Sequence, residues 1–235
     1  MYTCKELKQT LVTKIFPMNN SALKQRILKT ATFEFITTGI KPVTMDSLSR
    51  KLKISKRTLY ETFKDKEELL CESFVMGDKL MHRYIQSMIT DTTNPLEIVS
   101  LFFIYKIDEA NYLSPRFYFD LVKYPRVLRF LEKMNLELKN ERDALLEKCI
   151  EEGYFRPDIE YSIIGEMLSR QTMYMLTNNI PETKITRILL SMFFVCLRGC
   201  CTNKGQEEFE SLLKKHYHNI QPTTPEILRK RLEEL

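Results

Sequence analysis

The chain contains 235 residues, of which 43% are hydrophobic and 29% are charged, and its formal net charge is +5 at pH 7. Its longest apolar run, residues 188–197, is about half of what a bilayer-spanning helix needs, and the N-terminus lacks an apolar core followed by a cleavage site, so neither a membrane span nor a secretion signal is predicted. The six cysteines are scattered, and we expect free thiols in a soluble, cytoplasmic protein.

The distribution of helix breakers predicts an all-α fold. Only six glycines occur, and the nine prolines lie mostly between apolar periodic runs, near expected helix starts. A chain of this length is sufficient for one or two domains with a substantial core. We find no internal repeat and no low-complexity tract.

Residues 1–18 precede the segment with the clearest pattern. Apolar residues spaced four apart predict a short helix that ends at Pro17. This extension contains three lysines and one glutamate, so its net charge is +2.

Residues 44–70 predict two short helices joined by a three-residue turn, followed by the start of a third helix. Thr44 is a suitable N-cap for a helix over residues 45–52, because its hydroxyl can accept a backbone N–H of the first turn. Ser55 caps a second helix over residues 56–63 in the same way. The residues expected to face inward are Met45, Leu48, Leu52, Leu59 and Phe63.

The outward positions of the second helix are suited to a nucleic-acid surface. Lys56 and Arg57 lie at a helix N-terminus, where free backbone N–H groups and the helix dipole favour phosphate. Arginine can make a two-point contact with guanine, and Thr58 offers its methyl group to thymine. Tyr60 can reach a phosphate or a base edge, and Lys66, at the next helix start, is expected to bind the flanking backbone.

The charge distribution favours the same interpretation. Residues 19–70 contain eleven Lys and Arg against six acidic residues, whereas residues 71–235 contain 22 basic and 24 acidic residues. All of the excess positive charge therefore lies in the first 70 residues. A basic module joined to a near-neutral body is what phosphate binding requires, although any single lysine is more often just a solvated residue.

This stretch resembles the DNA-binding domain of the TetR family of bacterial transcriptional regulators, over roughly residues 21–70. One departure is Lys53, which stands in the turn where the family usually has glycine. The position tends to need a positive φ, and a side chain there is tolerated at modest cost. The matching residues are Ile27, Ala31, Phe35, Gly39, Thr44, Leu48, Ile54, Ser55, Lys56, Thr58, Leu59, Tyr60, Phe63, Lys66, Glu67, Glu68 and Leu69.

The larger, C-terminal part predicts a helical bundle. A long helix from Lys66 to about residue 89 connects the DNA module directly to this body. The charged stretch from Pro225 is compatible with a short helix and is expected to be loosely held. The remaining helices are expected at residues 95–112, 115–122, 125–152, 159–178, 182–202 and 207–217.

The resemblance implies that the body binds a small molecule in a hydrophobic cavity, coupled through the long helix to the spacing of two DNA modules. Aromatic and methionine side chains line such cavities well, although each of them more often fills an ordinary core. A buried tyrosine hydroxyl needs a partner, which a ligand can supply. The candidate pocket residues are Phe102, Tyr105, Tyr118, Met167 and Tyr174.

The resemblance also implies a homodimer. One recognition helix reads only a few base pairs, so specific binding usually requires two half-sites and a two-fold dimer. Apolar stripes over residues 163–168 and 185–197 would supply two helices from each subunit, unless both helices are internal. The candidate interface residues are Ile164, Leu168, Ile188, Leu189, Met192 and Phe193.

Other chemistries find little support. The sequence has no glycine-rich phosphate loop, nucleophile elbow or paired His–acid motif. His216, His218 and the Cys200–Cys201 pair lack the ligand spacing of a closed zinc site. We therefore predict no enzyme, no catalytic residue, no cofactor and no metal.

The sequence thus predicts an N-terminal three-helix DNA-binding domain followed by a larger helical bundle for ligand binding and dimerisation. The expected function is a dimeric repressor, released from a palindromic operator by a small hydrophobic or aromatic effector, with no membrane partner. Two alternatives remain, a helical protein-interaction module and a DNA-binding activator without ligand control. The candidate DNA-binding residues are Thr44, Ser55, Lys56, Arg57, Thr58, Tyr60 and Lys66.

The predicted domains are residues 1–18, 19–70, 71–217 and 218–235, the last being a C-terminal tail. For the first segment two interpretations stay open: an arm that reaches the DNA backbone through its lysines, or a translation start at Met18. Mass spectrometry of the native N-terminal peptide distinguishes them, because an intact Met1 peptide excludes the second.

Overall fold

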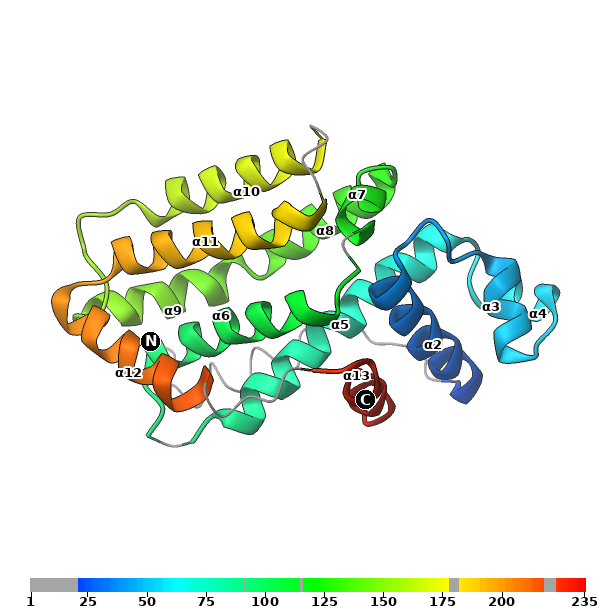
Figure 1. The fold of residues 1–235 in the computed structure, drawn as a ribbon, viewed down its shortest axis with the longest axis horizontal. Helices are drawn as coiled ribbons and strands as arrows, with labels where there is room; N and C mark the ends of the chain where they lie inside the picture. The colour runs from blue at the N-terminus through cyan, green and yellow to red at the C-terminus, as the bar shows by residue number, and fades with distance from the viewer. Residues whose placement is uncertain (1–20, 91, 115, 178–181, 218–222) are drawn as a thin grey trace. The chain divides into compact units, whose positions relative to one another are not determined.

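The structure is a computed structural model, and it describes residues 21–90, 92–114, 116–177, 182–217 and 223–235. Within these ranges the regular structure is α-helical, apart from an isolated bridge that pairs Phe155 with Cys201 (Figure 1). The predicted all-α fold class is therefore confirmed. No helix within the same ranges is long and apolar enough to cross a membrane.

The described helices divide into two compact units, each with its own apolar core. We call residues 21–82, 112–137 and 223–235 the helix-turn-helix unit, and residues 83–111 and 138–217 the body unit. The first contains α2 (Ala22–Thr38), α3 (Met45–Leu52), α4 (Lys56–Thr62), most of α5 (Lys66–Met88), α7 (Arg116–Leu121), α8 (Pro125–Glu137) and α13 (Pro225–Glu233). The second contains most of α6 (Pro95–Tyr112), with α9 (Lys139–Glu151), α10 (Tyr161–Thr177), α11 (Glu182–Cys200) and α12 (Asn203–Tyr217).

The core of the helix-turn-helix unit is assembled from segments that are far apart in the sequence. Ile27, Ala31 and Phe35 on the inner face of α2 are almost completely buried, as their helical spacing predicts. The same cluster includes Phe117 of α7 and Leu232 of α13. The three-helix module therefore shares its core with two later segments of the chain.

Helix α7 is fastened to the end of α2 by backbone contacts. Gly39 ends α2 with a φ of 93°, a conformation that favours glycine, and a Cβ at this position would lie 3.3 Å from a side-chain atom of α7. The N–H of Ser114 donates to the carbonyl of Ile36 (2.7 Å). The buried carboxylate of Asp120 accepts from the N–H of Lys41 (2.6 Å). These bonds fix the segment that leads into α3.

The body unit has a second core in which aromatic rings pack together. The ring centroids of Phe103 and Phe209 are 6.0 Å apart, and both side chains are buried. Helix α12 begins close to the backbone of Tyr154, where a Cβ on Gly205 would lie 2.0 Å from the Tyr154 carbonyl oxygen. The N–H of Thr202 donates to that same carbonyl (2.9 Å). Glycine is therefore required at position 205 for this approach.

A buried carboxylate links α6 to the end of α12. Glu97 accepts hydrogen bonds from Lys215 (2.7 Å) and from the ring of His216 (2.7 Å). Burial opposes the ionisation of Glu97, but the hydrogen bonds from these two partners prevail and lower its pKa. The amide of Asn94 donates to Glu208 (2.8 Å) and adds a second link between the same segments.

Most of the predicted helices are confirmed to within a few residues. The helices predicted at 45–52 and 95–112 are found with these bounds. The helix predicted at 207–217 instead begins at Asn203, because the hydroxyl of Thr202 accepts a backbone N–H of the first turn (3.0 Å). The cap at Thr202 thus starts the helix four residues earlier than predicted.

The single helix predicted over residues 125–152 is wrong, since α8 and α9 are separated at Leu138. The two halves bury their apolar faces in different cores: Val127 of α8 belongs to the helix-turn-helix unit, and Cys149 of α9 belongs to the body unit. Near the break, Leu136 is 66% exposed. The apolar spacing over residues 125–152 was continuous enough to predict one helix, but the apolar side chains of its two halves pack into different cores.

The expectation of a loosely held C-terminal stretch is also wrong. Helix α13 buries Leu228 and Leu232, each only 1% exposed, in the core of the helix-turn-helix unit. The predicted N-terminal segment, residues 1–18, lies outside the described residues. The predicted domain borders remain predictions.

Candidate DNA-binding surface

Helix α3 begins with a reciprocal cap. The hydroxyl of Thr44 accepts the N–H of Ser47 (3.0 Å), and the hydroxyl of Ser47 accepts the N–H of Thr44 (2.9 Å). Two backbone donors at the helix start are thereby satisfied. Met45 and Leu48 are buried beneath this start, while Thr44 itself is exposed.

The turn between α3 and α4 has the backbone conformation that the sequence predicts. Lys53 ends α3 with φ 53° and ψ 44°, in the left-handed region, and no other non-glycine residue of the described ranges has a positive φ. Its N–H donates to the carbonyl of Arg50 (3.2 Å), and the next residue, Ile54, donates to Ser49 (3.0 Å). These bonds satisfy the last carbonyls of α3, so the turn forms even with a side chain at this position.

Helix α4 is set by its cap and by its buried face. The hydroxyl of Ser55 accepts the N–H of Thr58 (3.0 Å) and lies 2.8 Å from the Thr58 hydroxyl. Leu59 and Phe63 are fully buried, as predicted. Because both ends of α4 are fixed, its outer residues are held on a rigid helix rather than on a loop.

The predicted contact residues on α4 point outward. Lys56, Arg57 and Tyr60 are exposed, with Tyr60 at 49%, whereas Thr58 is half-buried beside the cap. Lys56 pairs with Asp46 (2.5 Å), and Arg57 pairs with Glu61 one turn later (2.8 Å). Ion pairs this exposed contribute little to stability, so exchanging a carboxylate for a DNA phosphate costs little.

Lys66 differs from the expectation. Its ammonium group donates to the carbonyl of Ile40 (2.6 Å) and lies 5.9 Å and 5.5 Å from the ring centroids of Phe35 and Tyr124. Burial lowers the pKa of Lys66, and the opposing attraction of Asp120 is weaker. In this conformation the ammonium group faces inward and fastens α5 to the segment after α2. Its predicted contact with the DNA backbone remains untested.

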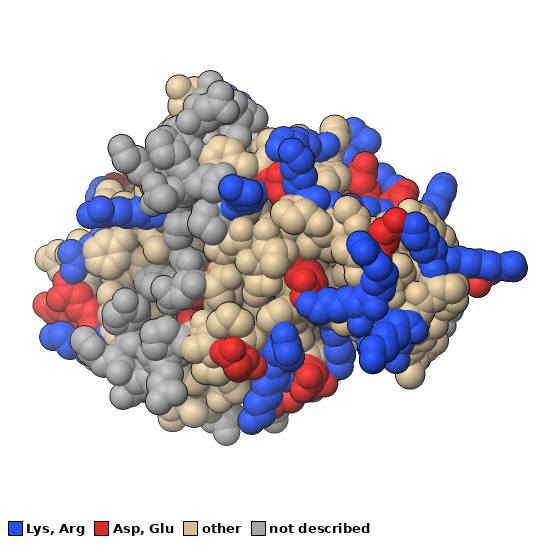
Figure 2. All heavy atoms as spheres, turned by 45° about the vertical axis from the view of Figure 1, so that its right-hand side comes forward, with Lys and Arg blue, Asp and Glu red and all other residues tan. Residues whose placement is uncertain are grey.

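Further basic residues surround α4 that the sequence reasoning did not select. Arg50 and Lys51, in the last turn of α3, are exposed, and Lys51 pairs with Glu34 of α2. The guanidinium of Arg26 donates to the carbonyl of Leu52 (3.1 Å), close to the turn. Figure 2 shows lysine and arginine side chains gathered on the forward, right-hand side, where α2, α3 and α4 lie. Since these residues are on α2 and α3, the spacing along α4 alone did not identify them.

The structure does not bring the five pocket candidates together. Tyr105 is buried in the body unit beside Tyr84 (centroids 5.4 Å apart), and Tyr118 belongs to the other unit, where it packs edge-on against Phe117. Phe102 is half-buried. Met167 and Tyr174, by contrast, are exposed on α10, at 49% and 56%. Their role as a ligand pocket remains a prediction.

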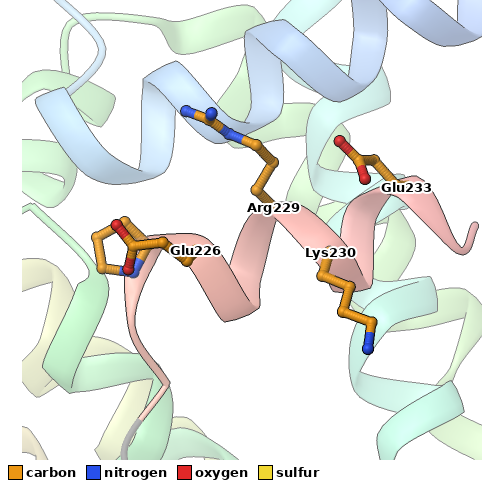
Figure 3. Close-up of a pocket in the computed structure, with 5 residues that line it drawn as sticks. Glu226, Arg229, Lys230 and Glu233 are labelled. Atoms are coloured by element: carbon orange, nitrogen blue, oxygen red, sulfur yellow. The ribbon is translucent and has the colours of Figure 1, made fainter.

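A shallow hollow lies elsewhere, along α13. It encloses about 180 Å³ and is polar at its edges (Figure 3). The lining residues are Pro225, Glu226, Arg229, Lys230 and Glu233. Because all of them lie on one surface helix, this hollow does not resemble the apolar cavity that the sequence predicts for the body.

The predicted interface helices, α10 and α11, pack against each other and leave an apolar face uncovered. Of the candidates, Phe193 is 42% exposed, while Ile164, Leu168, Ile188 and Met192 are half-buried, and the side chain of Leu189 lies outside the described side chains. Ile163, Met167 and Val195, which lie within the predicted apolar stripes, are exposed as well, and so is Tyr174. A contiguous exposed apolar surface marks an interaction site more often than a single exposed apolar residue does.

The cysteines and histidines that were considered as metal ligands have other environments. Burial raises the pKa of Cys200, and that of Cys201 to about 11, so both thiols are protonated at neutral pH. His216 is paired with Glu97, and His218 lies outside the described residues. Within the described ranges, no three metal-ligating side chains form a group that could hold an ion.

Residues 27–72 match the family model for bacterial regulatory proteins of the tetR family. These residues form a TetR-type helix-turn-helix domain. It is 29% identical over 154 residues to the HTH-type transcriptional repressor KstR2 of Mycobacterium tuberculosis, a match that covers 62% of this chain and 76% of the repressor. The chain is thus a DNA-binding transcriptional regulator that is similar to repressors of the TetR family.

Two solved structures share the fold. A TetR-family transcriptional regulator from Marinobacter aquaeolei VT8 aligns with a TM-score of 0.55 at 20% identity, over 82% of this chain and 97% of that chain. A gamma-butyrolactone receptor, an ArpA-like protein, aligns with a TM-score of 0.52 at 15% identity, over 85% and 98%. At such identities the likeness concerns the fold alone.

Proposed function

We propose that this TetR-family regulator is a repressor that binds a palindromic operator as a homodimer in the cytoplasm and is released by a small-molecule effector. The observation that carries the proposal is the outer face of α4, where Lys56, Arg57 and Tyr60 are exposed on a capped, rigidly packed helix. A helix presented in this way is suited to the major groove, and its basic surroundings are suited to the phosphates. The residues proposed to contact DNA from this part of the surface are Thr44, Ser55, Lys56, Arg57, Thr58 and Tyr60.

Repression is favoured by the relatives. KstR2 of Mycobacterium tuberculosis carries the name of a transcriptional repressor, and the match to it extends well beyond the DNA-binding segment. A repressor needs only to occupy its operator, so the basic surface and a dimer suffice for the proposed activity.

The homodimer is supported by the uncovered face of α10 and α11. Ile163, Met167 and Tyr174 follow one another on α10 at helical spacing, and Phe193 and Val195 are exposed on α11. Two copies of this chain that pair through α10 and α11 would bury the exposed side chains of α10 together with one of the two on α11, because a two-fold axis places the same patch on both partners. The interface would then contain two helices from each subunit.

The effector is proposed to be a small hydrophobic or aromatic molecule that binds in the body unit. Tyr84 and Tyr105 lie beside each other there, with ring centroids 5.4 Å apart, and aromatic rings of this kind can pack against such a molecule. A protein of the same fold is named a gamma-butyrolactone receptor, and that name is compatible with a small-molecule effector. The effector would act by binding better to the form whose two recognition helices no longer match successive major grooves.

A selection of genomic fragments tests the proposal. The purified protein is mixed with sheared DNA from its own genome at moderate salt, and the retained fragments are sequenced. An enriched palindrome is expected with the wild-type protein and with the control variant Lys133→Ala, which removes an exposed helix ion pair remote in sequence from α4. Arg57→Ala is expected to weaken the enrichment and to relax the retained sequence at one position. Equal enrichment with both variants would contradict the role of α4, and no enrichment with any protein would contradict specific DNA binding.

A further inference from the structure

The helix-turn-helix unit is completed by the C-terminal end of the chain. Helix α12 ends at Tyr217 in the body unit, and α13 begins at Pro225 in the helix-turn-helix unit. Within the latter unit α13 packs against α2, the helix against which α3 is also packed. The chain therefore passes between the two units at residues 82–83, 111–112 and 137–138, and once more between α12 and α13.

The contact between α13 and α2 combines apolar burial with polar contacts. Leu228 and Leu232 are each 1% exposed and belong to the same cluster as the inner face of α2. The guanidinium of Arg229 lies 4.6 Å from the ring centroid of Phe33, and the ammonium group of Lys29 donates to the carbonyl of Glu233 (2.9 Å). Figure 3 shows Arg229 directed towards α2 and Lys230 directed away from it.

Helix α13 is too short to be stable by itself. It has nine residues, more than half of them charged, and isolated helices shorter than about 12–15 residues are marginal in water. Thr224 caps it, but the decisive contribution is the burial of its two leucines in a core that other segments provide. The folding of α13 is thus coupled to its docking on α2.

We propose that α13 is a strap that holds α2 in place and makes operator binding depend on the C-terminal end of the chain. Release of α13 removes its two leucines from the apolar cluster that they share with the inner face of α2. That cluster also holds Leu48 of α3 and Leu59 of α4, so a loosened α2 loosens the helices that face DNA. The part of this inference that concerns DNA rests on the proposed function.

The test compares two variants that change the net charge equally. The double variant Leu228→Asp/Leu232→Asp undocks the strap, and Lys230→Glu changes the charge by the same amount on the outward side of α13. Hydrogen exchange of the α2 amides is measured with the full chain, without DNA. Loss of one buried leucine commonly shifts an equilibrium by a factor of about thirty or more, so we expect at least that acceleration in the double variant and none in the control.

The amides of α6 and α12 show whether the double variant is folded, since both helices belong to the body unit. If these too lose protection, the milder Leu228→Ala variant replaces it. Operator affinity is then expected to fall about tenfold or more in the undocked variant, with the control unchanged. Unchanged α2 protection in the undocked variant, or an unchanged affinity despite lost protection, would overturn the proposal. If the wild-type chain bound no operator, the proposed function would fail, while the exchange measurement would still test the docking of the strap.

Discussion

The outer face of α4 and the uncovered face of α10 and α11 present opposite chemistry. On α4 the exposed residues are Lys56, Arg57 and Tyr60, and the apolar Leu59 is completely buried. On α10, Ile163 and Met167 are exposed instead. Exposed charge on a rigid helix can exchange water and carboxylate partners for phosphate, whereas exposed apolar surface gains free energy only when another apolar surface covers it. The two faces are therefore suited to different partners, DNA and a second copy of the chain.

The largest expected effect comes from removing the support beneath the charged face. Leu59→Ala leaves a cavity in a fully buried site and is expected to destabilise the helix-turn-helix unit by about 2–5 kcal/mol, with loss of DNA binding. Thermal unfolding and hydrogen exchange measure the change. Glu61→Ala on the exposed side of the same helix is the control and is expected to remain within about 0.5 kcal/mol of the wild type. Equal stability of the two variants would contradict the packing described here.

A charge on the apolar face separates the roles of the two faces. Met167→Glu places a carboxylate where the partner subunit is expected, and it should raise the dimer dissociation constant by about a hundredfold, roughly the effect of a central interface residue. Operator affinity should fall with it, because a monomer offers only one recognition helix. Sedimentation at several protein concentrations measures the equilibrium, with Ser169→Ala, an exposed position away from the stripe of Ile163, Met167 and Tyr174, as a control on the same helix. A dimer that persists unchanged would show that this face is not the interface.

Two substitutions on α4 distinguish base reading from phosphate binding. Arg57→Ala should cost about 1–3 kcal/mol of binding and relax the preference at one operator position. Lys56→Ala should weaken binding uniformly across sequences and reduce the slope of log K against log salt by about 1. Binding titrations over a range of salt, with a set of operator variants, measure both effects. A uniform loss for Arg57→Ala would assign it to a phosphate instead.

The smallest effect concerns the turn between α3 and α4. Lys53→Gly relieves a left-handed conformation and is expected to stabilise the helix-turn-helix unit by about 0.5–1 kcal/mol. Thermal unfolding measures the gain, and operator affinity should change little unless the lysine charge contributes to phosphate binding. A loss of stability would indicate that the lysine side chain makes a compensating contact.

The sequence predicted the local structure of the charged face well because caps and turns are decided by neighbouring residues. Thr44, Ser55 and the positive φ of Lys53 follow from hydrogen bonds within a few residues, and all three were predicted. Lys66 was predicted to bind the DNA backbone because it lies at a helix start, and that role stays a prediction; the sequence did not show that Ile40, 26 residues earlier, accepts its hydrogen bond. Contacts at that separation leave no local pattern.

The same limit explains the errors in the remainder of the chain. The helix breaks at Leu138 because the apolar residues before and after it pack into different cores. The docking of α13 depends on an apolar cluster whose other residues lie more than a hundred positions earlier in the sequence, for example those of α2. Similarly, apolar spacing identified α10 and α11 as amphipathic helices, but it did not decide which side chains face inward. Met167, for example, was placed both in the pocket and in the stripe of the facing helix; it is exposed, and its pocket role stays a prediction.

A hydroxyl-radical footprint of the wild-type protein on an enriched genomic fragment tests the central claim most directly. A dimer that reads DNA with α4 should protect two patches related by two-fold symmetry, with centres about 10–11 base pairs or a multiple of that apart. Each patch should fade in Arg57→Ala and persist in Lys133→Ala. A single protected patch, or protection that Arg57→Ala leaves intact, would contradict the account.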